Sequence, residues 1–391
     1  MKSIFIIFVT LVSFSLINSE ASSFSSSTSA CVSYSPSKRL ITVTCETATL
    51  ADVYLQLKDD GVLKKEDDKS ANRAIWLLNA KLLIEKNSRF IIDSADTAWL
   101  KIVSDGTTDV HNNIIVYGSM KIDSVKITSW NPNTNNYATN LGPDPPRAFI
   151  RVMKEATSSI EITNSEIAYL GYLSKGNYGY GITFFGGNKN LLAGNDIHHN
   201  FRGFYSEELG EGMIVEDNYI HSNYQYGLDP HTGTHDMIIR NNTVYDNGAI
   251  GIICSLDCYN ITIENNEVYN NFGYGIMFSR NMYDSIATDN YVYNQTNCIS
   301  VNTQSHNNEV YNNRVLECKN GIDLRNGAYN NDIHHNIIIE SGNGIKLRTG
   351  ASNNTFHYNT IIIINPKENG ISIDPDTIDN RFDNNQMIDS K

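Results

Sequence analysis

Long hydrophobic runs, basic patches and cysteine pairs at metal-binding spacing are all scarce in this 391-residue sequence. After Ile17 no apolar stretch is long enough to cross a bilayer, so no membrane span is expected in the mature chain. Lysine and arginine number 30 against 43 aspartate and glutamate residues, which gives a net charge of −13. Because no basic stripe is available to neutralise phosphates, nucleic acid is excluded as a partner.

Cysteine is too sparse to form the main scaffold of a chain of this size, although six residues suit an oxidising compartment: Cys31, Cys45, Cys254, Cys258, Cys298 and Cys318. The first two could staple the N-terminal segment. The last two fall about one repeat apart, where neighbouring coils would bring them close. Cys254 and Cys258 lack a second ligand pair at zinc spacing, so no metal site is proposed there. A reading of some of the six as simple buried thiols stays open.

The N-terminus has the pattern of a secretory signal. Lys2 precedes an apolar run to Ile17, and Ser19-Glu20-Ala21 fits a small-x-small cleavage site. We therefore expect a signal peptide over residues 1–21, with a retained membrane anchor as the alternative. The mature protein is expected outside the cytoplasm, secreted or at the cell surface.

A repeat of roughly two dozen residues dominates the sequence. The motif N-x-(I/V)-x-x-N recurs at spacings of 23 to 26 residues, beginning at Asn195, Asn218, Asn242, Asn266, Asn290, Asn313, Asn336, Asn359 and Asn385. A Gly-Ile-like pair follows most of these asparagines by eight or nine residues. Fixed periods of this kind are typical of solenoid architectures.

The repeat units favour strands over helices. Each unit holds short β-branched stretches between Asn and Gly turns, and none carries helical periodicity. The sequence therefore predicts an all-β fold, a single-stranded right-handed parallel β-helix with coils of about 22–26 residues. Stacked asparagines should form a hydrogen-bonded ladder at one corner, in a turn that tolerates the left-handed conformation.

Alternation within the segment after each glycine predicts which side chains point inward. The residue directly after the glycine, or after Cys298 in the one unit where cysteine replaces it, should enter the core, as for Ile182, Phe204, Leu228, Ile252, Ile276, Ile299, Ile322, Ile345 and Ile371. The residues two and four positions after it should then face solvent. Outside the array, residues 46–60 predict one amphipathic helix that could cap the first coil. The expected division is a linker and capping segment at 22–73 and a β-helix domain at 74–391.

One coil departs from the repeat in a concentrated way, in the string YGLDPHTGTHD from Tyr226 to Asp236. Asp229 and His231 are two residues apart on a predicted strand and should project from the same face, with Tyr226 at the turn before them. A phenol, a carboxylate and an imidazole brought together in this way can move protons on both sides of one carbon atom.

The string Tyr226-Gly227-Leu228-Asp229-Pro230-His231 resembles the mannuronan C5-epimerases. YLGY from Tyr169 and GFYS from Gly203, in the two preceding coils, add to the likeness, which is best over about 160–290. The resemblance implies a right-handed β-helix, a polymer of mannuronate as substrate, and catalytic roles for Tyr226, Asp229 and His231. Which of His231 and Tyr226 is the base stays open.

The resemblance also implies a cation that neutralises the substrate carboxylate, and here the sequence departs from the pattern. Relatives place an arginine after a serine in the coil that follows the DPH coil, whereas this chain has Ser255-Leu256. Lys175 is the first candidate for the missing cation and Arg280 the second. Further candidates for substrate binding are Tyr205, Glu207, Arg202, Arg325 and Arg348, although scattered surface charges would explain the last two nearly as well.

The expected function is C5 epimerisation of a uronate within an anionic polysaccharide. β-Elimination by a polysaccharide lyase shares the same enolate-like intermediate, so residue spacing does not separate the two reactions. A non-catalytic carbohydrate-binding or surface β-helix is a third reading, and Leu256 keeps it open. The sequence requires no cofactor; calcium stays open as a ligand, but no GGxGxD array is present.

Overall fold

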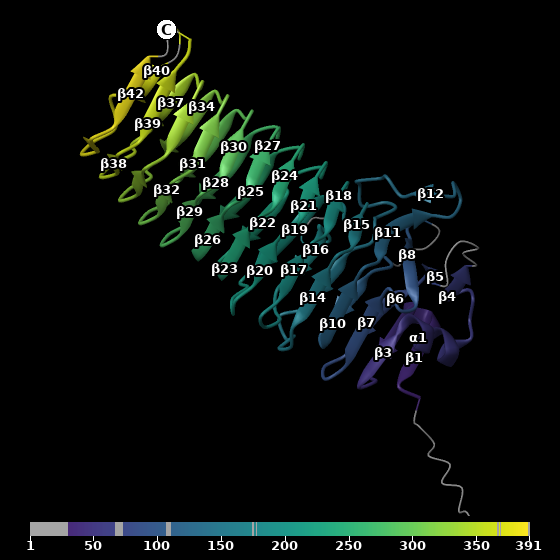
Figure 1. The fold of residues 1–391 in the computed structure, drawn as a ribbon. Coiled ribbons are helices and arrows are strands. Elements are labelled where there is room, and N and C mark those ends of the chain that lie inside the picture. The colour runs from purple at the N-terminus through teal and green to yellow at the C-terminus, as the bar shows by residue number, and fades with distance from the viewer. Residues whose placement is uncertain are drawn as a thin grey trace, which may run out of the picture.

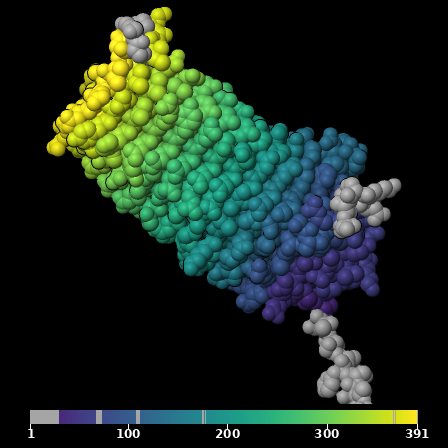
Figure 2. Space-filling view, in the orientation of Figure 1, coloured from purple at the N-terminus to yellow at the C-terminus, as the bar shows by residue number. Residues whose placement is uncertain are grey.

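The computed structural model describes residues 30–66, 73–106, 111–173, 176, 178–365, 367 and 369–389. The predicted signal peptide at residues 1–21 and the candidate Lys175 lie outside these residues. Over the described chain, short strands follow one another in coils that stack from the N-terminal to the C-terminal end (Figure 1). The space-filling view shows the coils as successive bands of an elongated body (Figure 2). No helix among the described residues is both long and apolar enough to cross a membrane.

The strands of the described residues form three long sheets, which we call sheets A, B and C. Sheet A contains, in order, β1 (Val32–Ser35), β2 (Leu40–Val43), β6 (Lys81–Ile84), β9 (Ile114–Val116), β13 (Ile150–Val152), β16 (Gly181–Phe184), β19 (Arg202–Glu207), β22 (Leu228–His231), β25 (Ile250–Ser255), β28 (Tyr274–Ser279), β31 (Asn297–Asn302), β34 (Asn320–Arg325), β37 (Asn343–Leu347) and β40 (Asn369–Ile373).

Sheet B contains β3 (Thr47–Thr49), β7 (Arg89–Asp93), β10 (Ser119–Asp123), β14 (Ile160–Thr163), β17 (Leu191–Ala193), β20 (Ile214–Glu216), β23 (His235–Arg240), β26 (Tyr259–Glu264), β29 (Ile286–Thr288), β32 (Glu309–Tyr311), β35 (Asp332–His334), β38 (Thr355–His357) and β41 (Arg381–Asp383).

Sheet C contains β4 (Leu63–Glu66), β5 (Ala74–Leu78), β8 (Thr97–Val103), β11 (Lys126–Asn131), β15 (Glu166–Ala168), β18 (Asp196–His198), β21 (Tyr219–His221), β24 (Thr243–Tyr245), β27 (Glu267–Tyr269), β30 (Tyr291–Tyr293), β33 (Arg314–Leu316), β36 (Ile337–Ile339), β39 (Thr360–Ile363) and β42 (Gln386–Asp389). The short β12 (Asn136–Tyr137) pairs with β11.

Neighbouring strands pair in parallel, so the chain advances by one coil each time it returns to the same sheet. Antiparallel pairing joins β1 to β2, β4 to β5 and β11 to β12. This topology confirms the predicted parallel solenoid. Parallel pairing already begins at β2, upstream of Ala74, and the division of the chain at that residue stays a prediction.

The predicted inward column fills the core. Eight of its members are fully buried, namely Ile182, Phe204, Leu228, Ile252, Ile276, Ile299, Ile322 and Ile345. A glycine precedes seven of them, and Cys298 precedes Ile299. The glycines are explained by contact between coils: a Cβ atom at Gly227 would lie 2.6 Å from the carbonyl oxygen of Gly251. That close approach requires a residue without a side chain.

The asparagine ladder forms as predicted. The side-chain amide of Asn242 donates to Asn266 Oδ1 on the next coil, and that of Asn266 donates to Asn290 Oδ1. The left-handed conformation belongs to the residue before each ladder asparagine, such as Asn241 and Asn265. The ladder side chains are thereby left to point inward, where they also bind backbone carbonyl groups.

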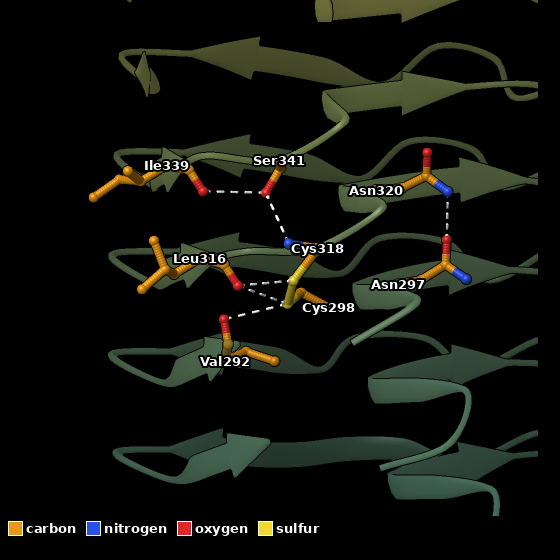
Figure 3. The surroundings of a disulfide bond; sticks show 8 residues. All are labelled: Val292, Asn297, Cys298, Leu316, Cys318, Asn320, Ile339 and Ser341. Atoms are coloured by element: carbon orange, nitrogen blue, oxygen red, sulfur yellow. Dashed lines mark hydrogen bonds between the residues drawn. A yellow bond between two sulfur atoms is a disulfide. The ribbon is translucent and has the colours of Figure 1, made fainter. Parts of the chain in front are cut away.

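Two disulfide bonds join the pairs that the spacing suggested, Cys31 with Cys45 and Cys298 with Cys318. The second lies beside a further asparagine pair, in which Asn320 donates to Asn297 Oδ1 at 2.7 Å (Figure 3). Cys254 and Cys258 are buried free thiols. The disulfides therefore link segments within or between adjacent coils and do not replace the apolar core.

The N-terminal helix is shorter than the predicted 46–60. Residues Thr47–Thr49 form β3, and α1 spans Leu50–Leu57, after the short 3-10 helix η1 (Pro36–Lys38). Thr49 and Asp52 make a reciprocal capping box that begins α1, and Lys58 ends it in the left-handed conformation. Leu50 and Val53 join the core, while a capping function for α1 stays a prediction.

Candidate functional site

The site is organised around β22 of sheet A. Leu228 points into the core, and Asp229 and His231 project from the outer side of the same strand, as the alternation predicts. Strands β19 and β25 lie on either side of β22 in the parallel ladder. The site therefore draws its side chains from several adjacent coils.

Asp229 is fully buried and paired with Arg202 from β19. Arg202 Nη1 lies 2.6 Å from Asp229 Oδ2, and Arg202 Nε donates to Gln225 Oε1 at 2.9 Å. Burial raises the pKa of Asp229 to about 7, although the positive charges of Arg202 and Arg280 act in the opposite direction. Asp229 Oδ1 is buried and has no hydrogen-bond partner among the described residues. Asp229 therefore anchors Arg202 from beneath and does not reach solvent itself.

Aromatic rings surround the Arg202 guanidinium. Its central carbon lies 4.2 Å from the ring centroid of Tyr180, 5.0 Å from that of Tyr226 and 5.2 Å from that of Tyr205. Cation–π contacts of this geometry hold the guanidinium in place. Tyr226 is half-buried and packs against a small apolar cluster of Ile250, Ile253 and Met277 on the outer side of the sheet.

His231 is held in a defined neutral tautomer. Arg280 Nη2 lies 3.1 Å from His231 Nε2, and His231 Nδ1 lies 2.6 Å from Thr232 Oγ1. Because a guanidinium only donates, Nε2 accepts, and the ring proton is on Nδ1 and is donated to Thr232. Burial, and then the charges of Arg280 and Arg202, lower the pKa of His231 to about 4. His231 is therefore an uncharged imidazole at neutral pH.

Arg280 reaches the site from two coils away. Ser255 pairs with Ser279 in the ladder, so Arg280 occupies the repeat position of Leu256 one coil further along. Its Nε donates to Ser255 Oγ at 2.7 Å, and its exposed guanidinium extends across that coil to His231. A cation thus stands beside the imidazole, although the coil that follows β22 carries Leu256 where the resemblance implies an arginine.

Tyr205 and Glu207 border the site on β19. The Tyr205 hydroxyl donates to Glu207 Oε2 at 3.0 Å, and the rings of Tyr205 and His231 lie 5.6 Å apart. Burial and the charges of Glu207 and Asp229 raise the pKa of the Tyr205 phenol well above its usual range. Tyr205 therefore stays protonated and acts as a hydrogen-bond donor.

Arg325 and Arg348 gather at a second buried carboxylate on the same sheet. Arg348 binds Asp323 through Nε at 2.9 Å and Nη2 at 3.1 Å, and Arg325 Nε lies 3.6 Å from Asp323 Oδ2. Arg325 also donates to the Tyr274 hydroxyl. These contacts place both arginines in one cluster, which lies four strands beyond Asp229 in the ladder.

The expectation that the residues two positions after each glycine face solvent is wrong for most of them. Thr183, Asp229, Ser300 and Asp323 are fully buried, although they point away from the core. Long side chains from neighbouring positions, above all Arg202 over Asp229 and Arg348 over Asp323, close over this column. Alternation fixes the direction of a side chain but does not describe what covers it.

Sequence reasoning missed three supporting residues: Thr232, Gln225 and Tyr180. Thr232 follows the DPH string directly, so its position next to His231 was a usable signal. Gln225 and Tyr180 act through Arg202, whose attachment to Asp229 became apparent only from the pairing of β19 with β22.

Comparisons with known proteins agree with this architecture. A family model described as the right-handed β-helix region matches residues 111–255, 150–313 and 231–387. Mannuronan C5-epimerases from Pseudomonas syringae pv. tomato and Pseudomonas fluorescens are 27% and 26% identical over 201 and 197 residues. Each alignment covers 48% of this chain and 36% of the relative, so only about a third of each relative is matched.

Solved structures share the fold over most of the chain. The periplasmic alginate epimerase AlgG superposes with a TM-score of 0.77 at 21% identity, covering 89% of this chain and 85% of that structure. The A-module of an Azotobacter vinelandii mannuronan C-5 epimerase gives a TM-score of 0.63 at 14% identity, with coverages of 82% and 90%. At these identities the likeness establishes a common architecture.

Proposed function

The chain belongs to the right-handed β-helix family, and we propose that it is a C5-epimerase that converts mannuronate to guluronate residues within a polysaccharide outside the cytoplasm. The observation that carries the proposal is the neutral His231 imidazole flanked by Arg280, on a coil that also holds the Asp229–Arg202 pair. The mannuronan C5-epimerases among its relatives, and the fold shared with the periplasmic alginate epimerase, support the same reaction.

The reaction requires the removal of a weakly acidic proton from C5 of the uronate. The C5 hydrogen of a uronate is hard to remove until the charge of the adjacent carboxylate is neutralised, because the intermediate places further negative charge on that group. We assign this neutralisation to Arg280, whose guanidinium is exposed on the outer side of sheet A. Lys175 stays an alternative source of the same charge.

His231 is the proposed base. Its pKa of about 4 keeps it uncharged, and among the described residues Arg280 is the hydrogen-bond partner of its Nε2 lone pair. When Arg280 turns to the substrate carboxylate, that lone pair becomes available to take the C5 proton. Tyr226 then delivers its hydroxyl proton to the opposite face of C5. Afterwards His231 releases its proton to solvent and the Tyr226 phenolate takes one from solvent, which restores both groups. Asp229 contributes by orienting Arg202 against the rings of Tyr226 and Tyr205.

The test is proton NMR of polymannuronate incubated with the purified protein in deuterated water. Guluronate signals with deuterium at C5 are expected from the wild type and should be absent with His231→Ala. Removal of a general base typically costs about 10²- to 10⁴-fold in rate. Lys121→Gln, a charge change on sheet B and away from the site, should leave the incorporation of deuterium at C5 unchanged. Circular dichroism of each variant establishes that it is folded.

Two outcomes would redirect the proposal. Unsaturated 4,5-ends in place of guluronate would identify a lyase, since elimination expels the C4 substituent from the same intermediate. An unchanged spectrum with the folded wild type would overturn mannuronan as the substrate.

A further inference from the structure

A cluster of two imidazoles and a carboxylate lies on sheet B, away from the candidate site on sheet A. Asp332 and His334 come from β35, and His357 comes from β38 on the next coil. One ligand atom from each residue lies within 4.8 Å of the other two. His357 Nε2 is 2.9 Å from Asp332 Oδ1, and the rings of His334 and His357 stack 4.9 Å apart. All three residues are half-buried.

A second carboxylate borders the cluster. Glu309 on β32 pairs with Asp332 in the ladder, and its negative charge acts on His334. Neutral imidazoles and ionised carboxylates are the forms in which these groups bind metal ions.

The chain contains a matched copy of the same arrangement on sheet C. There Glu166, Asp196, His198 and His221 occupy the corresponding register positions on β15, β18 and β21. His221 Nε2 lies 3.0 Å from Asp196 Oδ1, and the rings of His198 and His221 stack 5.1 Å apart, as in the sheet B cluster. In both copies the aspartate and the first histidine belong to the same string, Asn-Asp-Ile-His-His-Asn, which starts at Asn195 and at Asn331.

The copy on sheet C carries its own cation. Lys126 pairs with Glu166 in the ladder, and its Nζ lies 2.7 Å from Glu166 Oε1, which is also 3.4 Å from His198 Nε2. Hydrogen bonds from His198 and Lys126, acting against burial, lower the pKa of Glu166 to about 2. The negative charge in this copy is thus neutralised by the protein.

The copy on sheet B has an apolar residue at the position of that lysine. Ile286 pairs with Glu309 in the ladder, as Lys126 pairs with Glu166. Within the described part of the chain, no lysine or arginine forms an ion pair with Glu309, Asp332, His334 or His357. The two copies therefore share their acceptor groups and differ in the source of positive charge.

We propose that Asp332, His334 and His357 bind a divalent transition-metal ion of the zinc type, with Glu309 at its edge. Two imidazole nitrogens and one carboxylate oxygen suit such ions, and open positions would be filled by water. The ion would link the coils of β35 and β38 and stabilise that end of the solenoid. The site shares no residue with the proposed epimerase centre, so either proposal can fail without the other.

Calorimetric titration of the full chain with Zn²⁺, using protein purified without a polyhistidine tag, tests the site. We expect binding to the wild type, weakened at least about tenfold by His357→Ala and by Asp332→Asn. His221→Ala, the matched change on sheet C, should leave the affinity unchanged. The Cu²⁺ form should show imidazole nitrogen couplings in its electron paramagnetic resonance spectrum.

A second variant tests the inference without touching a ligand. Ile286→Lys gives the sheet B copy a lysine at the position that Lys126 occupies in the sheet C copy. It should abolish Zn²⁺ binding and leave the midpoint of thermal unfolding of the metal-free protein unchanged. Absence of Zn²⁺ binding by the wild type would overturn the proposal. So would equal losses from His221→Ala and His357→Ala, or undiminished binding by a folded Ile286→Lys protein.

Discussion

At the scale of single residues, each ring nitrogen of His231 has a hydrogen-bond partner. Arg280 donates to Nε2, and Nδ1 donates to the hydroxyl of Thr232, a residue in the left-handed conformation directly after β22. A base is useful only if its lone pair faces the substrate, and the nitrogen that carries the proton is decided by the partner of the other nitrogen. Thr232 is therefore a positioning residue for His231.

Thr232→Ala is expected to lower kcat about ten- to a hundredfold, less than loss of His231 itself. The imidazole would then lose the acceptor that fixes its tautomer, while Arg280 and the substrate contacts stay in place, so KM should change little. Steady-state kinetics on oligomannuronate measures both constants. Thr232→Ser restores the hydroxyl and should recover most of the activity; failure to recover would show that the methyl group matters and the hydrogen bond does not.

The pH dependence of kcat/KM reports which group must be deprotonated in the free enzyme. Because the pKa of His231 is lowered to about 4, the base form persists well below neutrality, and activity should fall only as pH approaches that value. Arg280 contributes to this lowering, so Arg280→Gln should move the acid limb upward while reducing the maximum. An acid limb near pH 7 in both proteins would instead assign control to Asp229, whose pKa is raised to about 7.

The asparagine ladder connects the coils at the scale of structural elements. Asn266 is buried, accepts from the backbone N–H and the side-chain amide of Asn242, and donates to Ile239 O and Asn290 Oδ1. Each coil therefore depends on both neighbours for hydrogen bonds that water does not replace.

Asn266→Ala should reduce the free energy of unfolding by about 2–4 kcal/mol, because it leaves the buried N–H of Asn242 and the carbonyl of Ile239 without partners. Urea unfolding followed by circular dichroism gives the change. Thr262→Ala, a half-buried change on the neighbouring strand β26, is the control and should cost less than about 1 kcal/mol. Equal losses from the two variants would contradict a specific role for the ladder.

The regular elements could be predicted from the sequence because each signal repeats. A column such as Ile252, Ile276 and Ile299 is fixed by strict alternation and a constant period, and the structure confirms its burial. The N-terminal helix was predicted too long because its start depends on the single capping box of Thr49 and Asp52. A local hydrogen bond of that kind has no second copy to support it.

The site could be predicted only in part, for a related reason. The shared direction of Asp229 and His231 follows from alternation on one strand, whereas the contacts of Arg202 and Arg280 run between coils. Such contacts depend on the path of a long side chain over its neighbours. The sequence identified both arginines as candidates but not which of the two would lie against Asp229 and which against His231.

The whole molecule carries a net charge of −13, which opposes binding of an anionic polymer. Two places on sheet A carry local positive charge that offsets this repulsion. Arg280 is exposed beside His231, and at Asp323 two arginines share one carboxylate, which leaves a net positive charge there. The two places are separated by four strand steps from Asp229 to Asp323, roughly 19 Å along the solenoid.

A uronate chain lying along sheet A would reach the Asp323 cluster only if it is long enough to span that distance. Arg348→Gln should therefore raise KM for polymannuronate and long oligomers, leave KM for short oligomers unchanged, and leave kcat unchanged for both. The effect should shrink as salt is added, because the attraction between a partly exposed charge and the polymer is screened over a Debye length of about 8–10 Å near physiological ionic strength. Lys121→Gln removes one positive charge from sheet B and is the matched control. A rise in KM for short oligomers, or an equal rise from Lys121→Gln, would mean that the polymer responds to net charge and does not follow the ladder from Asp229 to Asp323.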